Sequence, residues 1–356
     1  MALDLSVSSI DLTRQLCDLP SESGDEKRVA DDIWAVLEKA PHLELFRDGD
    51  AIVAKTNLGR DRRVVIAGHI DTVPINDNVP TRYETLDGVD YLWGRGTVDM
   101  KAGCAVALLL AVELAEPTVD LTWVWYDHEE VSDALNGLGR LTRLYPELLR
   151  ADFAILMEPS NASVEGGCNG NLRAEIRTHG LRSHSARSWI GDNAIHKAAP
   201  VLDILAAYEP RQVEVDGLVY REGLNAVGIS GGIAGNVIPD ECMVHVNYRF
   251  APSRSAEEAV AHIRELFGAF EVEIVDLAQG ARPGLDAPLA QEFLAAVGGT
   301  PAPKYGWTDV ARFAGLGIPA VNYGPGDPMK AHADDERVAV DQITACEQGL
   351  RAWLTA

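Results

Sequence analysis

The stretch Val64-Val65-Ile66-Ala67-Gly68-His69-Ile70-Asp71-Thr72-Val73-Pro74 runs from an apolar, mostly β-branched segment into a loop that contains proline. This composition favours a strand, because β-branched side chains pack well on a pleated surface. Side chains two positions apart on a strand point to the same face, so His69 and Asp71 are expected to lie together. Such a pair can hold a metal ion, one residue as ligand and the other by orienting it. A purely structural histidine is the alternative interpretation.

Two further apolar segments end in acidic residues. Residues 121–126 precede Asp127-His128-Glu129-Glu130, and residues 153–157 precede Glu158-Pro159. Three apolar strands separated by helices, each ending at a potential ligand, predict a doubly wound α/β sheet with its site at the carboxyl ends of the strands. Taken alone, residues 127–130 are also compatible with an acidic surface loop.

A glycine-rich segment, residues 93–103, carries Asp99 and precedes an apolar helix expected over residues 105–114. Asp99 is therefore either the N-cap of that helix or a metal carboxylate.

The pattern changes after about residue 170. Residues 171–283 read as strand, helix, two strands, helix and strand, which is the β-α-β-β-α-β order of a ferredoxin-like α+β domain inserted into the first domain. The first domain would then comprise residues 1–170 and 284–356. Its second part is predicted to contain a helix over 288–297, a helix capped by Thr308-Asp309, a strand over 320–323 and a final helix over 339–354.

Composition excludes several classes of function. The chain of 356 residues has 31 basic and 54 acidic residues, and its net charge of −23 would repel nucleic acid and anionic membranes. The five cysteines are never spaced as C-x-x-C, so any metal must be held by His, Asp and Glu. The sequence has no signal-peptide pattern and no apolar run near the roughly 20 residues that span a bilayer, which predicts a cytoplasmic protein.

The candidate ligands form a two-metal set of two imidazoles and three carboxylates: His69, Asp99, Glu130, Glu158 and His332. Nitrogen and oxygen ligands without thiolate suit Zn²⁺, with Co²⁺ or Mn²⁺ as possible substitutes. Two ions that share a carboxylate and a water would generate hydroxide near neutral pH, which is hydrolase chemistry.

The chain contains, in this order, the motifs His-x-Asp, Gly-Arg-Gly-x-x-Asp-Met-Lys, Glu-Glu, Glu-Pro and His. In this it resembles the dizinc metallopeptidase family of aminoacylases, carboxypeptidases, acetylornithine deacetylases and desuccinylases. The resemblance covers nearly the whole chain. The resemblance implies that His69 and Glu158 bind one zinc ion, that Glu130 and His332 bind the other, and that Asp99 bridges them. It also implies that Asp71 orients His69 and that Glu129 is the general base.

The same resemblance assigns roles to the inserted domain, which would act as a lid and form a homodimer. His184 would donate to the oxyanion across the dimer interface, Asn236 would be the lid asparagine, and Arg249 would bind a substrate carboxylate. Without the resemblance, His184 reads as a solvated loop histidine and Arg249 as a surface strand residue. Thr308 and Gly324 are expected near the acyl group.

Two departures from the usual family pattern bear on the substrate. The segments Gly166-Gly167-Cys168-Asn169-Gly170 and His128-Glu129-Glu130-Val131 resemble the desuccinylase branch of Gram-positive actinobacteria, whereas proteobacterial relatives carry arginine near Cys168. The resemblance implies hydrolysis of N-succinyl-LL-2,6-diaminopimelate, an anionic N-acyl amino acid that requires cations such as Arg249. The alternatives are an acetylornithine deacetylase, another aminoacylase or a dipeptidase, and a non-catalytic binding protein on this fold, against which the intact Glu129 and ligand set count.

Overall fold

The computed structural model describes residues 3–356, which divide into two compact units. Unit 1 comprises Met1–Gly166, Pro283–Ala302 and Thr308–Ala356, and unit 2 comprises Gly167–Arg282 and Pro303–Trp307. Residues 303–307, which the sequence analysis placed with the first domain, cluster with unit 2. The reason is local pairing, since the Trp307 indole Nε1 donates to the carbonyl of Gln279 at 3.0 Å.

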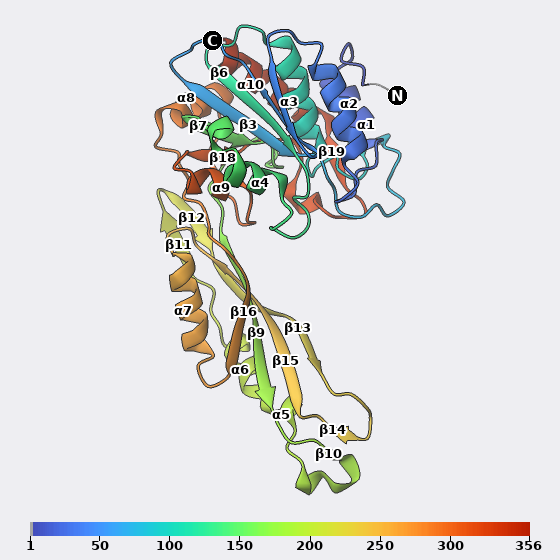
Figure 1. Cartoon of the computed structure of the whole chain (residues 1–356), viewed down its shortest axis with the longest axis vertical. Helices are drawn as coiled ribbons and strands as arrows, with labels where there is room; N and C mark the ends of the chain where they lie inside the picture. The colour runs from blue at the N-terminus through green and yellow to red at the C-terminus, as the bar shows by residue number, and fades with distance from the viewer. Residues whose placement is uncertain (1–2) are drawn as a thin grey trace. The chain divides into compact units, whose positions relative to one another are not determined.

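Unit 1 is built on an eight-stranded mixed sheet with the strand order β1-β2-β6-β3-β7-β18-β8-β17. Figure 1 labels its strands β3, β6, β7 and β18. Its central strands β6, β3, β7 and β18 are parallel, whereas β2 pairs antiparallel with β6. The strands are β1 (Glu44–Asp48), β2 (Ala51–Lys55), β3 (Arg63–His69), β6 (Asp120–Tyr126), β7 (Phe153–Leu156), β8 (Glu165–Gly166), β17 (Ala302–Pro303) and β18 (Ala320–Asn322). The predicted α/β class with a doubly wound mixed sheet is confirmed.

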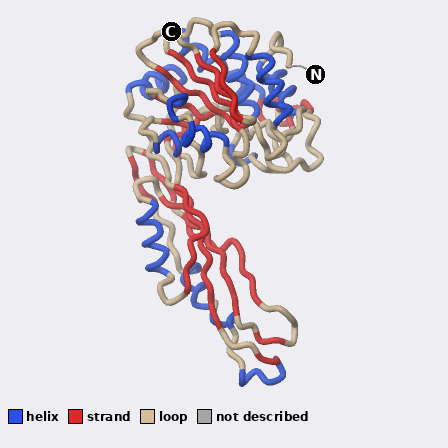
Figure 2. The backbone as a smooth tube through the Cα atoms, in the orientation of Figure 1, coloured by secondary structure: helices blue, strands red, loops and turns tan. Residues whose placement is uncertain are grey.

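Helices surround these central strands (Figure 2). Contacts join α1 to α3, α3 to α10 and α10 to α8, while α9 packs against β7 and β18. The helices are α1 (Ser9–Cys17), α2 (Lys27–Leu37), α3 (Lys101–Glu113), α4 (Gly137–Leu144), α8 (Pro288–Val297), α9 (Val310–Gly315) and α10 (Val340–Thr355). None of the helices within residues 3–356 has the length and the apolar character that a bilayer span requires.

One helix start differs from the sequence prediction, and one predicted cap lacks its side-chain bond. Helix α3 begins at Lys101, four residues early, because the lysine side chain is buried and its Nζ donates to the carbonyls of Leu16 and Leu19 at 3.1 and 2.8 Å. Helix α9 begins directly after Asp309, its N-cap, as predicted, but the Asp309 side chain makes no capping bond. Its carboxylate instead accepts from the Asn136 amide at 3.1 Å and pairs with Arg312.

A smaller three-stranded sheet lies beside the glycine-rich segment. It contains β4 (Arg82–Leu86), β5 (Val89–Trp93) and β19 (Arg337–Ala339), with β5 in the centre. The pairing of Trp93 with Arg337 brings the chain just after His332 next to the segment that leads to Asp99.

Unit 2 contains a four-stranded antiparallel sheet with the order β13-β15-β9-β16. Its members are β9 (Gly170–His179), β13 (Gly223–Gly231), β15 (Glu241–Phe250) and β16 (Glu271–Ala278), and its helices are α5 (Ala194–Lys197), α6 (Ala199–Ala206) and α7 (Ala256–Leu266). Alternate residues of β9 and β15, such as Ile176 and Val244, form a buried core with Ile263 of α7. This strand order and the intervening helices confirm the predicted ferredoxin-like α+β fold.

Five short elements complete unit 2. Strands β11 (Gln212–Val215) and β12 (Leu218–Arg221) form a hairpin. Strand β10 (Ser183–His184) pairs with β14 (Val237–Ile238), and a 3-10 segment, Ser185–Ile190, follows β10.

Candidate metal centre

The candidate ligands gather at one edge of the unit 1 sheet. His69 is the last residue of β3 and pairs in register with Tyr126 at the end of β6, while Ala67 pairs with Leu156 at the end of β7. The three parallel strands therefore end at the same level. Glu129 and Glu130 follow β6 and Glu158 follows β7, so these candidate ligands lie at the carboxyl ends of the parallel strands.

Three overlapping groups of side chains place their ligand atoms within 4.8 Å of one another. They are His69 with Glu129 and Glu130, His69 with Asp99 and Glu158, and Asp99 with Glu130 and His332. The imidazole Nε2 of His69 lies 3.0 Å from Asp99 Oδ1, and His332 Nε2 lies 3.2 Å from Asp99 Oδ2 and 3.0 Å from Glu130 Oε1. Asp99 thus presents one oxygen to each histidine, which is the arrangement of a shared carboxylate.

The charges around the two histidines favour a cation. Burial alone would lower the pKa of His69, but contacts with Asp71 and Asp99 raise it well above its ordinary value. Hydrogen bonds to Asp99 and Glu130 raise the pKa of His332 to about 10. Burial opposes ionisation of Asp99, yet His332 and His69 lower the pKa of its carboxyl. Because these side chains bring carboxylates and imidazoles together, the residues fit one or more divalent cations.

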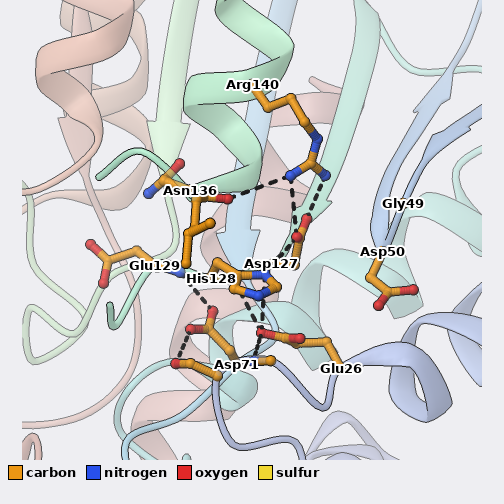
Figure 3. Close-up of polar contacts among 12 residues, drawn as sticks. Glu26, Gly49, Asp50, Asp71, Asp127, His128, Glu129, Asn136 and Arg140 are labelled. Carbon is orange, nitrogen blue, oxygen red and sulfur yellow. Dashed lines mark hydrogen bonds and ion pairs between the residues drawn. The ribbon is translucent and has the colours of Figure 1, made fainter. Parts of the chain in front are cut away.

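Asp71 connects the ends of β3 and β6. Its Oδ1 and Oδ2 accept hydrogen bonds of 3.0 Å from the backbone amides of Glu129 and Glu130, respectively (Figure 3), and Ser23 Oγ donates to Oδ2 at 2.7 Å. The shorter contact of His69 Nδ1 is to the Asp71 carbonyl at 3.0 Å, with the carboxylate at 3.5 Å. Asp71 therefore supports both the histidine and the turn that carries the two glutamates.

Residues 127–130 are not a solvated acidic loop. Asp127 is buried and pairs with Arg140 at 2.9 Å, while His128 lies between Asp127 and the buried Glu26 (Figure 3). His128 has a φ of 58°, a left-handed conformation that side chains other than glycine rarely adopt. These contacts fix the turn from which the side chains of Glu129 and Glu130 project.

Glu129 stands among other acids. Burial raises the pKa of its carboxyl, His69 opposes this, and the charges of Asp309, Glu158 and Glu130 raise the pKa further, so the net shift is well upward. A carboxyl whose pKa is raised in this way is suited to accept and release a proton near neutral pH.

Asp99 is not the N-cap of α3. The N-cap is Met100, without a side-chain capping bond, and the Asp99 carboxylate contacts His69 and His332 instead. Arg95 and Glu336, which no sequence pattern singled out, form a buried ion pair beside Asp99. The available signal was the charged side chain of Arg95 inside a glycine-rich turn that precedes a buried helix. No sequence pattern identifies Glu336 as its partner.

His184, Asn236 and Arg249 belong to unit 2. Strand pairing brings the first two together, since His184 pairs with Val237 and Ser185 N donates to the Asn236 carbonyl at 2.9 Å. Arg249 is partly buried on β15 and its Nε donates to Asn247 Oδ1 at 3.2 Å. Burial, reinforced by the charge of Arg173, lowers the pKa of Arg249. Among residues 3–356, no carboxylate forms an ion pair with it.

Thr308 and Gly324 lie in unit 1 and make internal contacts. The Thr308 hydroxyl is buried and donates to Asn322 Oδ1 at 2.9 Å. The Gly324 amide donates to Ser160 Oγ at 3.0 Å. The Thr308 hydroxyl and the Gly324 amide therefore brace the loops around β18, and contact of either residue with an acyl group remains a prediction.

Comparison with known proteins agrees with this geometry. The family model of peptidase family M20/M25/M40 matches residues 65–356, which contain every candidate ligand. The chain belongs to the M20/M25/M40 peptidase family. Members of this family of metallopeptidases use divalent metal ions, in line with the donor groups at the sheet edge.

Relatives of this M20 protein match over its full length. A Mycobacterium tuberculosis protein, named provisionally as succinyl-diaminopimelate desuccinylase DapE, is 54% identical over 99% of both chains. Succinyl-diaminopimelate desuccinylase from Corynebacterium glutamicum is 48% identical over 99% of this chain and 98% of its own.

Solved structures with low identity share the fold. A tripeptidase from Staphylococcus aureus superposes with a TM-score of 0.78 at 20% identity, covering 99% of this chain and 98% of its own. The M20 family metallo-carboxypeptidase Sso-CP2 from Sulfolobus solfataricus gives a TM-score of 0.76 at 15% identity, with 98% of each chain covered.

Proposed function

We propose that this protein hydrolyses N-succinyl-LL-2,6-diaminopimelate to succinate and LL-2,6-diaminopimelate, a step of diaminopimelate and lysine biosynthesis. The observation that carries the proposal is the full-length identity of 54% and 48% to relatives named for this reaction. The candidate ligands and Glu129 are gathered at one edge of the sheet, which supports an amide hydrolase over a non-catalytic binding protein.

We further propose that the centre holds two Zn²⁺ ions, with Co²⁺ or Mn²⁺ as substitutes. His69 and Glu158 would hold one ion and Glu130 and His332 the other, with Asp99 shared, because the ligand groups overlap at that residue. When bound, the ions supply Lewis-acid polarisation of the amide carbonyl and lower the pKa of water.

Glu129 is proposed as the general base. Its carboxylate takes a proton from the attacking water and returns that proton to the leaving amine nitrogen, a role that its raised pKa and its position beside the ligands support. Asp71 keeps this carboxylate in place through the amide hydrogen bonds of the turn.

Unit 2 is proposed to act as a lid and as the dimerisation domain of a homodimer. His184 Nδ1 accepts a hydrogen bond from the Ala186 amide at 3.0 Å, so its neutral ring carries the proton on Nε2 and can donate to an oxyanion. Arg249, without a carboxylate partner in the described chain, would bind a substrate carboxylate bidentately, and Asn236 would lie beside His184.

The test compares hydrolysis of N-succinyl-LL-2,6-diaminopimelate, N-acetylornithine and a plain dipeptide by the zinc-loaded protein. We expect kcat/KM for the succinyl substrate to exceed the others by at least about 100-fold, because the site's polar groups match one acyl chain. Glu129→Ala should abolish turnover, whereas Glu265→Ala, an exposed glutamate on α7, should not change it. Preference for N-acetylornithine would contradict the proposed substrate, and absence of all turnover would contradict an enzyme.

A further inference from the structure

A buried ion pair lies behind the candidate ligands. Arg95 Nη1 is 2.7 Å from Glu336 Oε2, and the two side chains are only 4% and 1% exposed. The residues are separated by 241 positions in the chain. Burying two charges costs desolvation energy that mutual attraction only partly offsets, so such a pair is weak evidence for stability alone. Its other contacts indicate what it does.

Glu336 holds the backbone of the shared ligand. Its second oxygen, Oε1, accepts hydrogen bonds from the amides of Val98 and Asp99 at 2.9 and 3.2 Å. Its own carbonyl accepts from the Gly94 amide at 3.0 Å. The Asp99 side chain, which faces both histidines, therefore projects from a backbone segment that one carboxylate fixes at two consecutive amides.

Arg95 reaches the loops that follow two other parts of the site. Its Nε donates to the Pro74 carbonyl at 3.2 Å, three residues after Asp71, and its Nη1 donates to the Ala333 carbonyl at 3.3 Å, directly after His332. His332 has a φ of 63°, a left-handed conformation that a histidine keeps only when its surroundings impose it. The guanidinium supplies one of those constraints.

We infer that Arg95 and Glu336 are positioning residues for the ion bound by Asp99, Glu130 and His332, an inference that rests on the proposed two-metal function. The pair holds the segments of two of these three ligands, Asp99 and His332. In the group of His69, Asp99 and Glu158 it holds only Asp99. Loss of the pair should therefore weaken the ion at His332 more than the ion at His69.

A matched control separates positioning from general support. Asp120 is also a buried carboxylate in unit 1, and it accepts from the amides of Leu58, Gly59 and Arg60 and from the Thr56 hydroxyl. It begins β6, whereas the site lies beyond the other end of that strand. Asp120→Asn removes comparable hydrogen bonds without touching the metal centre.

The experiment is calorimetric titration of ZnCl₂ into metal-free wild-type, Glu336→Gln, Arg95→Lys and Asp120→Asn proteins, with bound zinc counted by mass spectrometry. We expect two ions in wild type and, in Glu336→Gln, about 10- to 100-fold weaker binding of one of them, the range typical for loss of outer-sphere partners. Arg95→Lys keeps the charge but cannot reach all three acceptors, so it should shift the same ion less. Asp120→Asn should bind both ions as wild type does.

A second pair of variants identifies the ion. In a His332→Ala background, which lacks that ligand, Glu336→Gln should change the zinc affinity by no more than about a further two-fold. The ion that Glu336 supports is already weakened there, so the double-mutant cycle has little interaction left to remove. Wild-type zinc affinities in both Glu336→Gln and Arg95→Lys, equal weakening of both ions, or an equal loss in Asp120→Asn would overturn the inference. If Glu336→Gln does not fold, Arg95→Lys decides. Wild type that binds fewer than two ions would instead overturn the proposed two-metal function.

Discussion

Asp71 acts at the scale of a single residue. Burial would raise the pKa of its carboxyl, but contacts with His69, Ser23 and the amide of Glu130 lower it to about 2. The side chain is therefore ionised at every pH at which the protein is expected to work. As an anion it accepts from two consecutive amides and stands beside an imidazole, so one residue connects the ligand on β3 to the glutamates after β6.

Asp71→Asn should lower kcat about 10- to 100-fold, the range for partners that orient metal ligands. The substituted amide has only one acceptor oxygen, so one of the hydrogen bonds from the Glu129 and Glu130 amides is lost. Steady-state kinetics together with zinc counting would check this. Ser23→Ala, which removes one donor to the same carboxylate, should cost less than about 5-fold, and an Asp71→Asn protein with wild-type kcat would contradict the role.

At the scale of elements, α3 is attached to α1 by a buried lysine. Burial lowers the pKa of Lys101, and its Nζ donates to the carbonyls of Leu16, near the end of α1, and Leu19. The Leu16 carbonyl also accepts from the Leu19 amide at 3.3 Å, so Lys101 is a further donor there, while it is the donor to the buried Leu19 carbonyl. The lysine therefore connects two helices of the layer that supports the site.

Lys101→Met should reduce the free energy of unfolding by about 1 to 3 kcal/mol, because the buried Leu19 carbonyl loses its donor and the Leu16 carbonyl keeps only backbone donors. Urea unfolding of the metal-free protein measures it. The matched control is Lys27→Met, which removes an exposed ion pair with Asp31 and should change the free energy of unfolding by less than about 0.5 kcal/mol. Equal losses of unfolding free energy in Lys101→Met and Lys27→Met would contradict a stabilising role for the buried hydrogen bonds of Lys101.

The β11–β12 hairpin of unit 2 is closed by Arg211 and Glu222, whose side chains make two hydrogen bonds of 2.9 Å. Burial would raise the pKa of Glu222, but Arg211 and the Ala251 amide outweigh it and lower the pKa. A lowered folded-state pKa stabilises the protein above the unfolded-state value of roughly 4.3, and this stabilisation is lost as the pH falls through the folded-state value.

Glu222→Gln should therefore reduce the free energy of unfolding at pH 7, by about 1 to 3 kcal/mol. The difference from wild type should shrink as the pH falls below about 4, where the wild-type carboxylate is protonated too. Urea unfolding between pH 3 and pH 7, followed by circular dichroism, tests this. Glu241→Gln, a change at an exposed strand position, is the control, and a pH-independent difference for Glu222→Gln would contradict the linkage.

At the scale of the whole molecule, unit 2 carries exposed apolar side chains on and near its edge strand β13. Its large exposed apolar side chains include Leu181, Trp189, Ile190, Val227, Ile229 and Ile233. Of these, Val227 and Ile229 lie on the edge strand itself, and exposed apolar side chains on an unpaired strand edge are compatible with an interaction surface. They support the proposed homodimer, in which His184 of one protomer would serve the metal centre of its partner.

Mixing tests this sharing. Glu129→Ala and His184→Ala homodimers should each lose at least about 100-fold in kcat, since one lacks the base and the other the oxyanion donor. After subunit exchange of equal amounts, about half of the dimers are mixed and each mixed dimer has one intact site, so about a quarter of wild-type activity should return. Val227→Asp on β13 should weaken dimers in sedimentation experiments. No recovery despite proven exchange would place His184 in its own protomer's site or outside catalysis.

Sequence by itself determined the α/β class, the ferredoxin-like insertion and the ligand-bearing ends of β3, β6 and β7. Local periodicity predicts the strands and helices themselves. Parallel strands that end at the same edge of a sheet then bring the residues that follow them together. Only the tertiary structure decided that Lys101 begins α3, that the Asp309 carboxylate accepts from Asn136 and that Glu336 supports Asp99. The partners in these contacts lie tens to hundreds of residues apart, and whether a buried charge finds its counterpart depends on packing that no local pattern encodes.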